Sequence, residues 1–284
     1  MKFTEVQQRE FIRVALHCLA IEPTYNPYYA LLLSHLTSTS YSHRFTLQYA
    51  LWDFLRDLGQ DEVGGEGTKG DVRGTSGFAG LDEGKGGKAL GKVKRVGMGL
   101  GWVVSQGGID LTVFKVRHYI KVLLRVTHVA DRICQSHSRQ PVDFTSLQPA
   151  SKVFFRTMFS HLVLGLYTRS PGFKLTAKQR ARRGTSALSE DERETIEAIF
   201  VKTISAGGME LAQGTRYLLT REMGVSLQDS GQGAKRKNGK QNGTGVRGKR
   251  FERMMDDLEV DNEGDRGVVW EGLVVGEEVL GKMM

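Results

Sequence analysis

Apolar residues recur at helical spacing along most of the chain, and no segment alternates apolar and polar residues as a strand does. The first stripe lies within residues 5 to 21. It consists of Phe11, Val14, Ala15 and Cys18, and Ile12, Leu16 and Leu19 widen it. This pattern predicts a helix with one broad buried face.

The stretch "IEPTYNPYYALLLSHL" predicts how a second helix begins. Asn26 is a good N-cap residue, and Pro27 fits the first helical position because its missing N–H would have no partner there. Tyr25 and Tyr28 bracket this start, and Tyr29 to Leu36 is apolar nearly all round. We therefore expect this helix to lie between others. A third helix is predicted over about 42 to 58, with Gly59 as its C-terminal stop. Its apolar residues are Phe45, Tyr49, Leu51, Trp52, Leu55 and Leu58.

Glycine dominates the segment from Gly59 to Gly101, which holds fifteen glycines. Such a segment cannot bury enough apolar surface to offset its ordering entropy, so we expect a disordered insertion at about 59–87. Residues 90 to 104 nevertheless keep helical spacing. Glycines inside a helix cost roughly 1 kcal/mol each, so this helix depends on tertiary packing.

Helical patterns continue further along the chain. Residues 109 to 133 predict one long helix or two short ones, and Pro149 opens another with a clear apolar stripe. Ser189 and Glu192 form a capping-box signature before the next helix, and a last one is predicted over 209 to 223. No firm pattern follows. We expect an all-α fold of stacked antiparallel helix pairs over residues 1–223, interrupted by a second insertion at about 117–148. Residues 224–284 are expected to form a basic, largely disordered tail.

Candidate chemistry for an enzyme or a metal site is sparse. Gly84 and Lys85 lack the upstream glycine and the following Ser or Thr of a phosphate loop. Cys134 and His137 have the spacing of half a zinc site, but no second pair matches them. We therefore expect no catalytic residues, no cofactor, no metal and no small-molecule substrate. The two cysteines, and the lack of a signal peptide or a membrane-length apolar run, favour an intracellular protein.

Positive charge changes this picture. The formal charge is +8, which favours polyanionic partners such as RNA, or an acidic protein face. Basic residues concentrate in two clusters separated by a polar spacer. They are Lys235, Arg236, Lys237, Lys240, Arg247, Lys249 and Arg250. We interpret this segment as a nuclear import signal or a weak RNA-contacting arm, and a merely solvated tail is the alternative.

Two motifs carry a family resemblance. "ExTYNPYYA" includes Tyr25, Asn26, Pro27, Tyr28 and Tyr29, and "FTxQxALWD" includes Trp52 and Asp53. In combination they resemble the C-terminal MI domain, also called M-A-three, of the nucleolar MIF-four-G domain proteins, a family that includes the fungal suppressor of glycerol defect protein. Weaker similarity extends, with gaps, to about Met223. We expect these motif residues to have structural roles.

The resemblance implies a non-enzymatic scaffold of stacked helix pairs. It implies a nucleolar location, a role in small ribosomal subunit assembly and precursor rRNA processing, and contacts with pre-ribosomal proteins, precursor rRNA and a DEAD-box helicase of the initiation-factor-four-A class. Family members also carry a MIF-four-G domain before the MI domain. The chain is therefore expected to be a fragment, and the helicase contact is associated with the part that it lacks. An MI domain acting in splicing or translational control is the alternative function, and an all-α enzyme is disfavoured.

Overall fold

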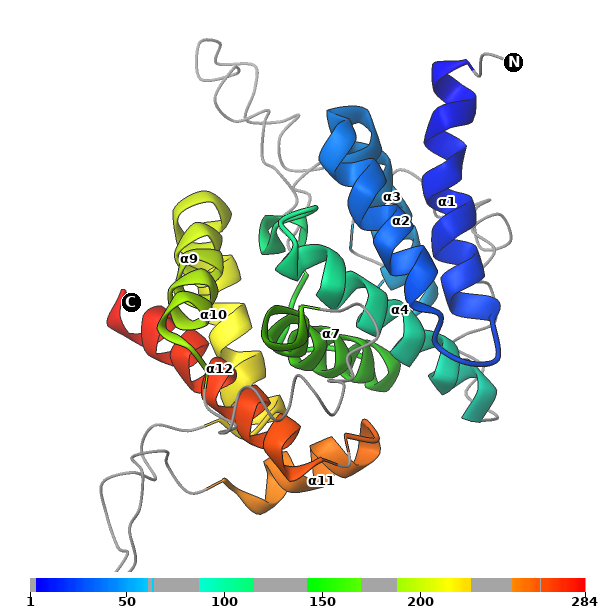
Figure 1. Ribbon diagram of the computed structural model, residues 1–284. Coiled ribbons are helices and arrows are strands. Elements are labelled where there is room, and N and C mark those ends of the chain that lie inside the picture. The colour runs from blue at the N-terminus through cyan, green and yellow to red at the C-terminus, as the bar shows by residue number, and fades with distance from the viewer. Residues whose placement is uncertain are drawn as a thin grey trace, which may run out of the picture.

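The computed structural model describes residues 4–60, 63, 87–114, 142–169, 188–225, 247–260 and 262–283. Every regular element in these ranges is a helix, and the helices stack in pairs, which confirms the expected all-α fold (Figure 1). The insertions expected at about 59–87 and 117–148 lie mostly outside the described residues, and the described end of the second one buries Val142, Phe144 and Leu147. The α-helices are α1 (Glu5–Ile21), α2 (Pro27–Thr39), α3 (Tyr41–Asp57), α4 (Gly87–Ser105), α7 (Pro149–Thr168), α9 (Glu190–Gly207), α10 (Met209–Tyr217), α11 (Lys249–Asp257) and α12 (Glu263–Lys282). Two shorter turns are the 3₁₀ turn η1 (Leu111–Phe114) and the π turn η2 (Leu218–Glu222).

Helices α1, α2 and α3 contact one another, and short links join them so that neighbours run in opposite directions (Figure 1). The buried face of α1 differs from the expected one. Ile12, Leu16 and Leu19 are fully buried, whereas Phe11 and Val14 are 42% and 56% exposed. Both sides of α1 are apolar, and its packing against α2, α3 and α4 selects the side that carries Ile12.

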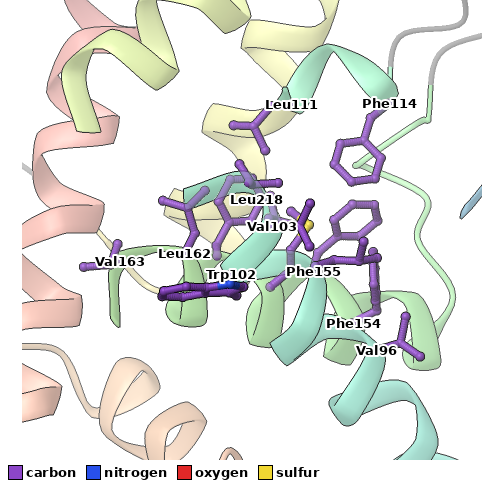
Figure 2. Packing of buried hydrophobic residues seen from close by; sticks show 14 of the residues in the cluster. Val96, Trp102, Val103, Leu111, Phe114, Phe154, Phe155, Leu162, Val163 and Leu218 are labelled. Carbon is purple, nitrogen blue, oxygen red and sulfur yellow. The ribbon is translucent and has the colours of Figure 1, made fainter. Parts of the chain in front are cut away.

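The central contact of the fold joins α4 to α7, and Figure 2 shows buried side chains of both helices. At two glycines of α4 the contact reaches the main chain of α7. A methyl group on Gly97 would lie 3.0 Å from the carbonyl oxygen of Phe154. On Gly101, one turn later, it would lie 2.5 Å from the carbonyl oxygen of Met158. These glycines, which oppose helix formation locally, therefore allow α4 to approach the main chain of α7. The contact supplies the tertiary packing that the sequence requires of this helix.

Aromatic side chains gather around the N-terminal half of α7. Phe154 and Phe155 are fully buried, and Phe54 of α3 meets Phe154 edge-on with ring centres 5.4 Å apart. Phe114 of η1 and Phe144 meet Phe155 in the same way at 5.0 and 4.9 Å. Edge-to-face pairs of this kind add roughly 0.5–1.5 kcal/mol each beyond their area burial. The cluster thus holds α3, η1 and residues 142–148 against α7.

Two polar side chains that α7 buries, Thr157 and His161, carry no charge. The Thr157 hydroxyl donates to the carbonyl oxygen of Val153 at 2.8 Å. Burial lowers the pKa of His161 to about 3, because the protonated ring loses its hydration. His161 is therefore neutral at physiological pH, and α7 brings no buried histidine charge into the core.

The chain directly after α4 departs from the one long helix or two short ones expected over 109 to 133. Gly107 has φ +70°, and the amide nitrogens of Gly107 and Gly108 bond to the carbonyl oxygens of Val104 and Val103, each at 2.9 Å. This pair of bonds is a Schellman motif, which closes the end of α4. The following 3₁₀ turn η1 replaces the start of the expected helix, and residues 115 to 133 lie outside the described part of the chain.

The expectation of a largely disordered tail over 224–284 is wrong for residues 247–260 and 262–283, which form α11 and α12. Helix α12 packs against α7 and α9 and buries most of its length. A methyl group on Gly272 would lie 2.5 Å from Val163 Cγ1, and one on Gly276 would collide with the Phe200 ring. Two core contacts of α12 are therefore made by its own backbone, and the glycines interrupt the apolar stripe that Val269, Leu273 and Leu280 form.

Replacing Gly101 by Ala should destabilise the fold by roughly 1–3 kcal/mol, because its methyl group meets main-chain atoms of α7 that cannot move alone. Gly91→Ala is the matched control in the same helix. There the new methyl group would meet only the end of the Arg95 side chain, and helix propensity should add up to about 1 kcal/mol. Denaturant unfolding of both variants measures the difference. Equal stability of Gly101→Ala and the natural chain would disprove the backbone contact.

Candidate interaction surface

The start of α2 is fixed by three interactions of its own motif. The Oδ1 atom of Asn26 accepts a hydrogen bond from the amide of Tyr28 at 3.0 Å, and Pro27 occupies the first helical position. The Tyr29 hydroxyl donates to Oε1 of Glu22 at 2.8 Å. That hydrogen bond, together with burial, raises the pKa of Tyr29 to about 12. The motif therefore joins the end of α1 to the start of α2.

Arg95 of α4 donates hydrogen bonds to the link between α1 and α2. Its Nη2 atom donates to the carbonyl oxygen of Ala20 at 2.8 Å, and its Nη1 atom donates to that of Pro23 at 3.3 Å. Tyr25 lies partly buried beside the same turn, and burial raises its pKa. Tyr28, by contrast, is 60% exposed and meets the Tyr29 ring edge-on. The turn between α1 and α2 is thus anchored to α4, with Tyr28 on the outside.

The second motif fixes a different connection. Trp52 is buried, and its Nε1 atom donates to the carbonyl oxygen of Val113 at 2.9 Å, which ties α3 to η1. Asp53 pairs with Arg56 one turn later on the same helix. The two motifs therefore position the helices of one layer through separate contacts, α1 to α2 in the first case and α3 to η1 in the second.

An exposed row of aromatic side chains runs along α3. The aromatic row consists of Tyr41, Phe45 and Tyr49, which are 74%, 46% and 38% exposed. Their ring centres are 6.3 and 4.8 Å apart, and Tyr49 meets the buried Trp52 ring at 5.1 Å. The spacing of four residues places them on one side of the helix. The sequence pattern includes Phe45 and Tyr49 among the apolar residues of this helix, but it does not indicate which apolar side of α3 is covered.

Further apolar residues face outward on α1 and α2. Beside Phe11 and Val14, these are Ile21, Tyr28 and Leu31, which are 49% to 60% exposed. Apolar side chains scattered singly over a surface are ordinary, but here several of them occur on three consecutive helices. Desolvating such side chains stabilises a complex, so this part of the surface is suited to binding another protein.

The structure divides the predicted basic residues into two groups. Lys235, Arg236, Lys237 and Lys240 lie outside the described residues. Arg247 pairs with Glu252 at 3.6 Å and with Glu263 at 2.6 Å. Lys249 and Arg250 occupy the first turn of α11 and are exposed. The last two are therefore held on a helix, contrary to their expected place in an extended tail.

Two other kinds of site are absent from the described ranges. No three side chains of His, Cys, Asp or Glu gather there as a metal-binding group. None of the helices in that part of the chain is long and apolar enough to cross a bilayer. Cys134 and His137, which have the spacing of half a zinc site, lie outside the described residues.

Comparison with known proteins finds similarity for the three N-terminal helices. Residues 1–64, which contain α1, α2 and α3, match the family model of the MA3 domain. Over 52 residues the chain is 42% identical to Nucleolar MIF4G domain-containing protein 1 of Homo sapiens, and 38% identical to the protein of that name from Mus musculus. Each match covers 18% of this chain but only 6% of the relative's length. No solved structure shows a significant similarity to the chain. The expected resemblance to an MI-type domain is thus confirmed for the first 64 residues.

Replacing Asn26 by Ala should lower the free energy of unfolding by about 1 kcal/mol, because the amide of Tyr28 loses its acceptor. Asn26→Asp is the control, since Asp is an equally good N-cap and keeps an acceptor oxygen. Thermal unfolding of the three proteins measures the effect. If Asn26→Ala abolished partner binding while leaving stability unchanged, the structural role assigned to this motif would be wrong.

Proposed function

We propose that this chain is a non-enzymatic protein-interaction module of a nucleolar factor for small ribosomal subunit assembly and precursor rRNA processing. The observation that carries the proposal is the MA3 match over α1, α2 and α3, together with relatives whose name describes them as nucleolar. The proposal places the MI-type unit at residues 1–223. It assigns the chain no cofactor, no metal and no small-molecule substrate.

The aromatic row supplies a physical basis for binding a protein partner. Its side chains present large apolar areas, and each has few rotatable bonds to immobilise, so burying them costs little conformational entropy. Trp52 holds the inner end of the row in place through its bond to Val113. A partner therefore meets a surface that is largely organised before binding, which favours affinity.

Pre-ribosomal proteins and precursor rRNA are the partners that this proposal names. A DEAD-box helicase of the initiation-factor-four-A class is a second protein partner, proposed from the family resemblance. The alternative is an MI-domain module that binds such a helicase in splicing or translational control. Co-sedimentation separates the alternatives, because only the first predicts association with precursors of the small ribosomal subunit.

We expect a tagged chain to co-sediment with small-subunit precursors, and Tyr41→Ser, Phe45→Ser and Tyr49→Ser together to reduce that association about tenfold or more. The control is Val201→Ser with Met209→Ser, which removes two exposed apolar side chains from α9 and α10. Circular dichroism should show unchanged helix content in both variants.

Three results would count against this function. Absence of the natural chain from the precursor fractions would overturn the assembly role. Recovery with spliceosomal or translation complexes instead would favour the alternative. An equal loss in the control variant would show that binding depends on general surface apolarity and not on the aromatic row.

We also propose that the basic segment from Lys235 to Arg250 directs nuclear import. Replacing Lys235, Arg236 and Lys237 by Ala should shift a fluorescent fusion towards the cytoplasm, because a receptor with acidic sites loses one of its two basic clusters. Arg9→Ala, Arg13→Ala and Lys202→Ala together remove the same charge from helices as a control. Undiminished nuclear accumulation of the first variant would overturn the import role of this segment.

A further inference from the structure

A cleft of about 480 Å³ opens between α7, η2 and α11, away from the aromatic row. Arg156 of α7 and Glu222 of η2 line one side. Lys249, Arg250 and Arg253 line the other, from the first five residues of α11. The cleft is therefore assembled from three segments that are far apart in the sequence, and basic side chains dominate it.

Glu222 is a buried carboxylate in the lining of this cleft, which we call the basic cleft. Its side chain is only 8% exposed, and it accepts hydrogen bonds from Lys152 at 3.1 Å and from Arg156 at 2.7 Å. Burial alone would raise the pKa of Glu222, but the bonds from these two cations outweigh it and hold the pKa below its usual value. The carboxylate is thus ionised, and it fixes Arg156 in position.

The π turn explains how Glu222 reaches this place. At the end of α10 the amide of Met223 bonds to the carbonyl oxygen of Leu218, five residues back, at 3.0 Å. A π turn inserts one residue into the helical repeat and so rotates the side chains that follow it. Such turns are frequent at functional sites. Here the turn ends on Glu222 itself.

Positive charge in the cleft exceeds what its carboxylates can neutralise. The lining holds four cations and two carboxylates, the second being Asp257. Within the described residues, Lys249 and Arg253 form no ion pair. The Nε atom of Arg156 is buried without a hydrogen-bond acceptor among them. The exposed, unneutralised charge of Lys249 and Arg253 therefore suits the cleft to an anionic ligand.

The surroundings of the cleft favour a phosphate backbone over an acidic peptide. A peptide partner usually needs apolar anchors, but the one apolar residue in the lining, Met254, is 3% exposed. A phosphate backbone needs only positive charge and hydrogen-bond donors. The lining includes no aromatic ring on which a base could stack. In the sequence, the basic run from Lys235 leads directly into the first turn of α11.

We propose that the basic cleft binds phosphates of an RNA backbone without reading its sequence, with Lys249, Arg250, Arg253 and Arg156 as the contacting residues. This site is separate from the aromatic row and extends the proposed function, because it gives the chain its own RNA contact. Arg156 is the fixed member, held by Glu222, whereas the exposed residues of α11 add charge along the rim.

The test compares two double variants of the full chain for binding to a fluorescently labelled single-stranded RNA of mixed sequence. Lys249→Ala with Arg253→Ala removes two exposed cations from the cleft. Arg13→Ala with Lys202→Ala removes the same charge from α1 and α9, where the side chains are 55% and 57% exposed. Fluorescence anisotropy across a range of salt concentrations gives the affinity and its salt dependence.

We expect the cleft variant to bind RNA about 20-fold more weakly near 0.1 M salt, and the slope of log affinity against log salt to fall by about 1.4, since each lost contact on single strands contributes about 0.7. The control should keep the slope of the natural chain, and RNAs of different sequence should bind alike. The aromatic-row variant should also keep its RNA affinity, so failure of this proposal is distinguishable from failure of the proposed function.

Three outcomes overturn the proposal. The first is that the natural chain fails to bind RNA at low salt. The second is that both double variants lose the same affinity, which would assign binding to net charge. The third is that a glutamate-rich peptide binds more tightly than RNA and that its binding depends on Lys249 and Arg253. That result would assign the cleft to an acidic protein segment.

Discussion

The close approach of α4 to α7 is the constraint on which the rest of the structure depends. Gly97 and Gly101 let the two main chains come together, and each weakens α4 as an isolated helix by roughly 1 kcal/mol. Helices α1 and α2 pack on α4, while α9 and α12 pack on α7 (Figure 1). The N-terminal and C-terminal helices therefore share one core because this central pair forms. A helix that is unfavourable alone becomes the most closely packed element of the fold.

Local sequence signals predicted the fold where the stabilising interaction is itself local. The cap at Asn26 and the capping box of Ser189 and Glu192 each involve residues two or three positions apart, so both could be read from the sequence. The buried face of α1 could not, because both of its sides are apolar and only the neighbouring helices decide between them. Helix α12 was not predicted because glycines occupy two of its buried positions. Its contacts with Val163 and Phe200 are made by glycines, which interrupt its apolar stripe and so weaken the sequence signal.

The candidate surfaces also combine local features, which the sequence indicates, with long-range features, which only the folded chain shows. The motif residues from Tyr25 to Tyr29 carry the family resemblance, and the structure places them at the start of α2, directly after the link that Arg95 of α4 hydrogen-bonds. Exposure of the aromatic row depends on which side of α3 is covered, a long-range property. The basic cleft combines Arg156 with residues of α11 and a π turn, so only the folded chain brings its cations together. The basic run was visible in the sequence, but its ordered end at Lys249 and Arg250 was not.

The contact between α4 and α7 also determines how the two surfaces relate in space. Side-chain layers between helices can adjust by changing rotamers, but at Gly97 and Gly101 there is no such layer between the main chains. Phe54 joins α3 to the same helix α7, and α7 contributes Arg156 to the basic cleft. The aromatic row and the cleft are thus carried by one stiff frame. Under the two proposals, a particle that touches both the aromatic row and the basic cleft must match a fixed span between them, so the chain would act as a spacer whose length is set by its backbone.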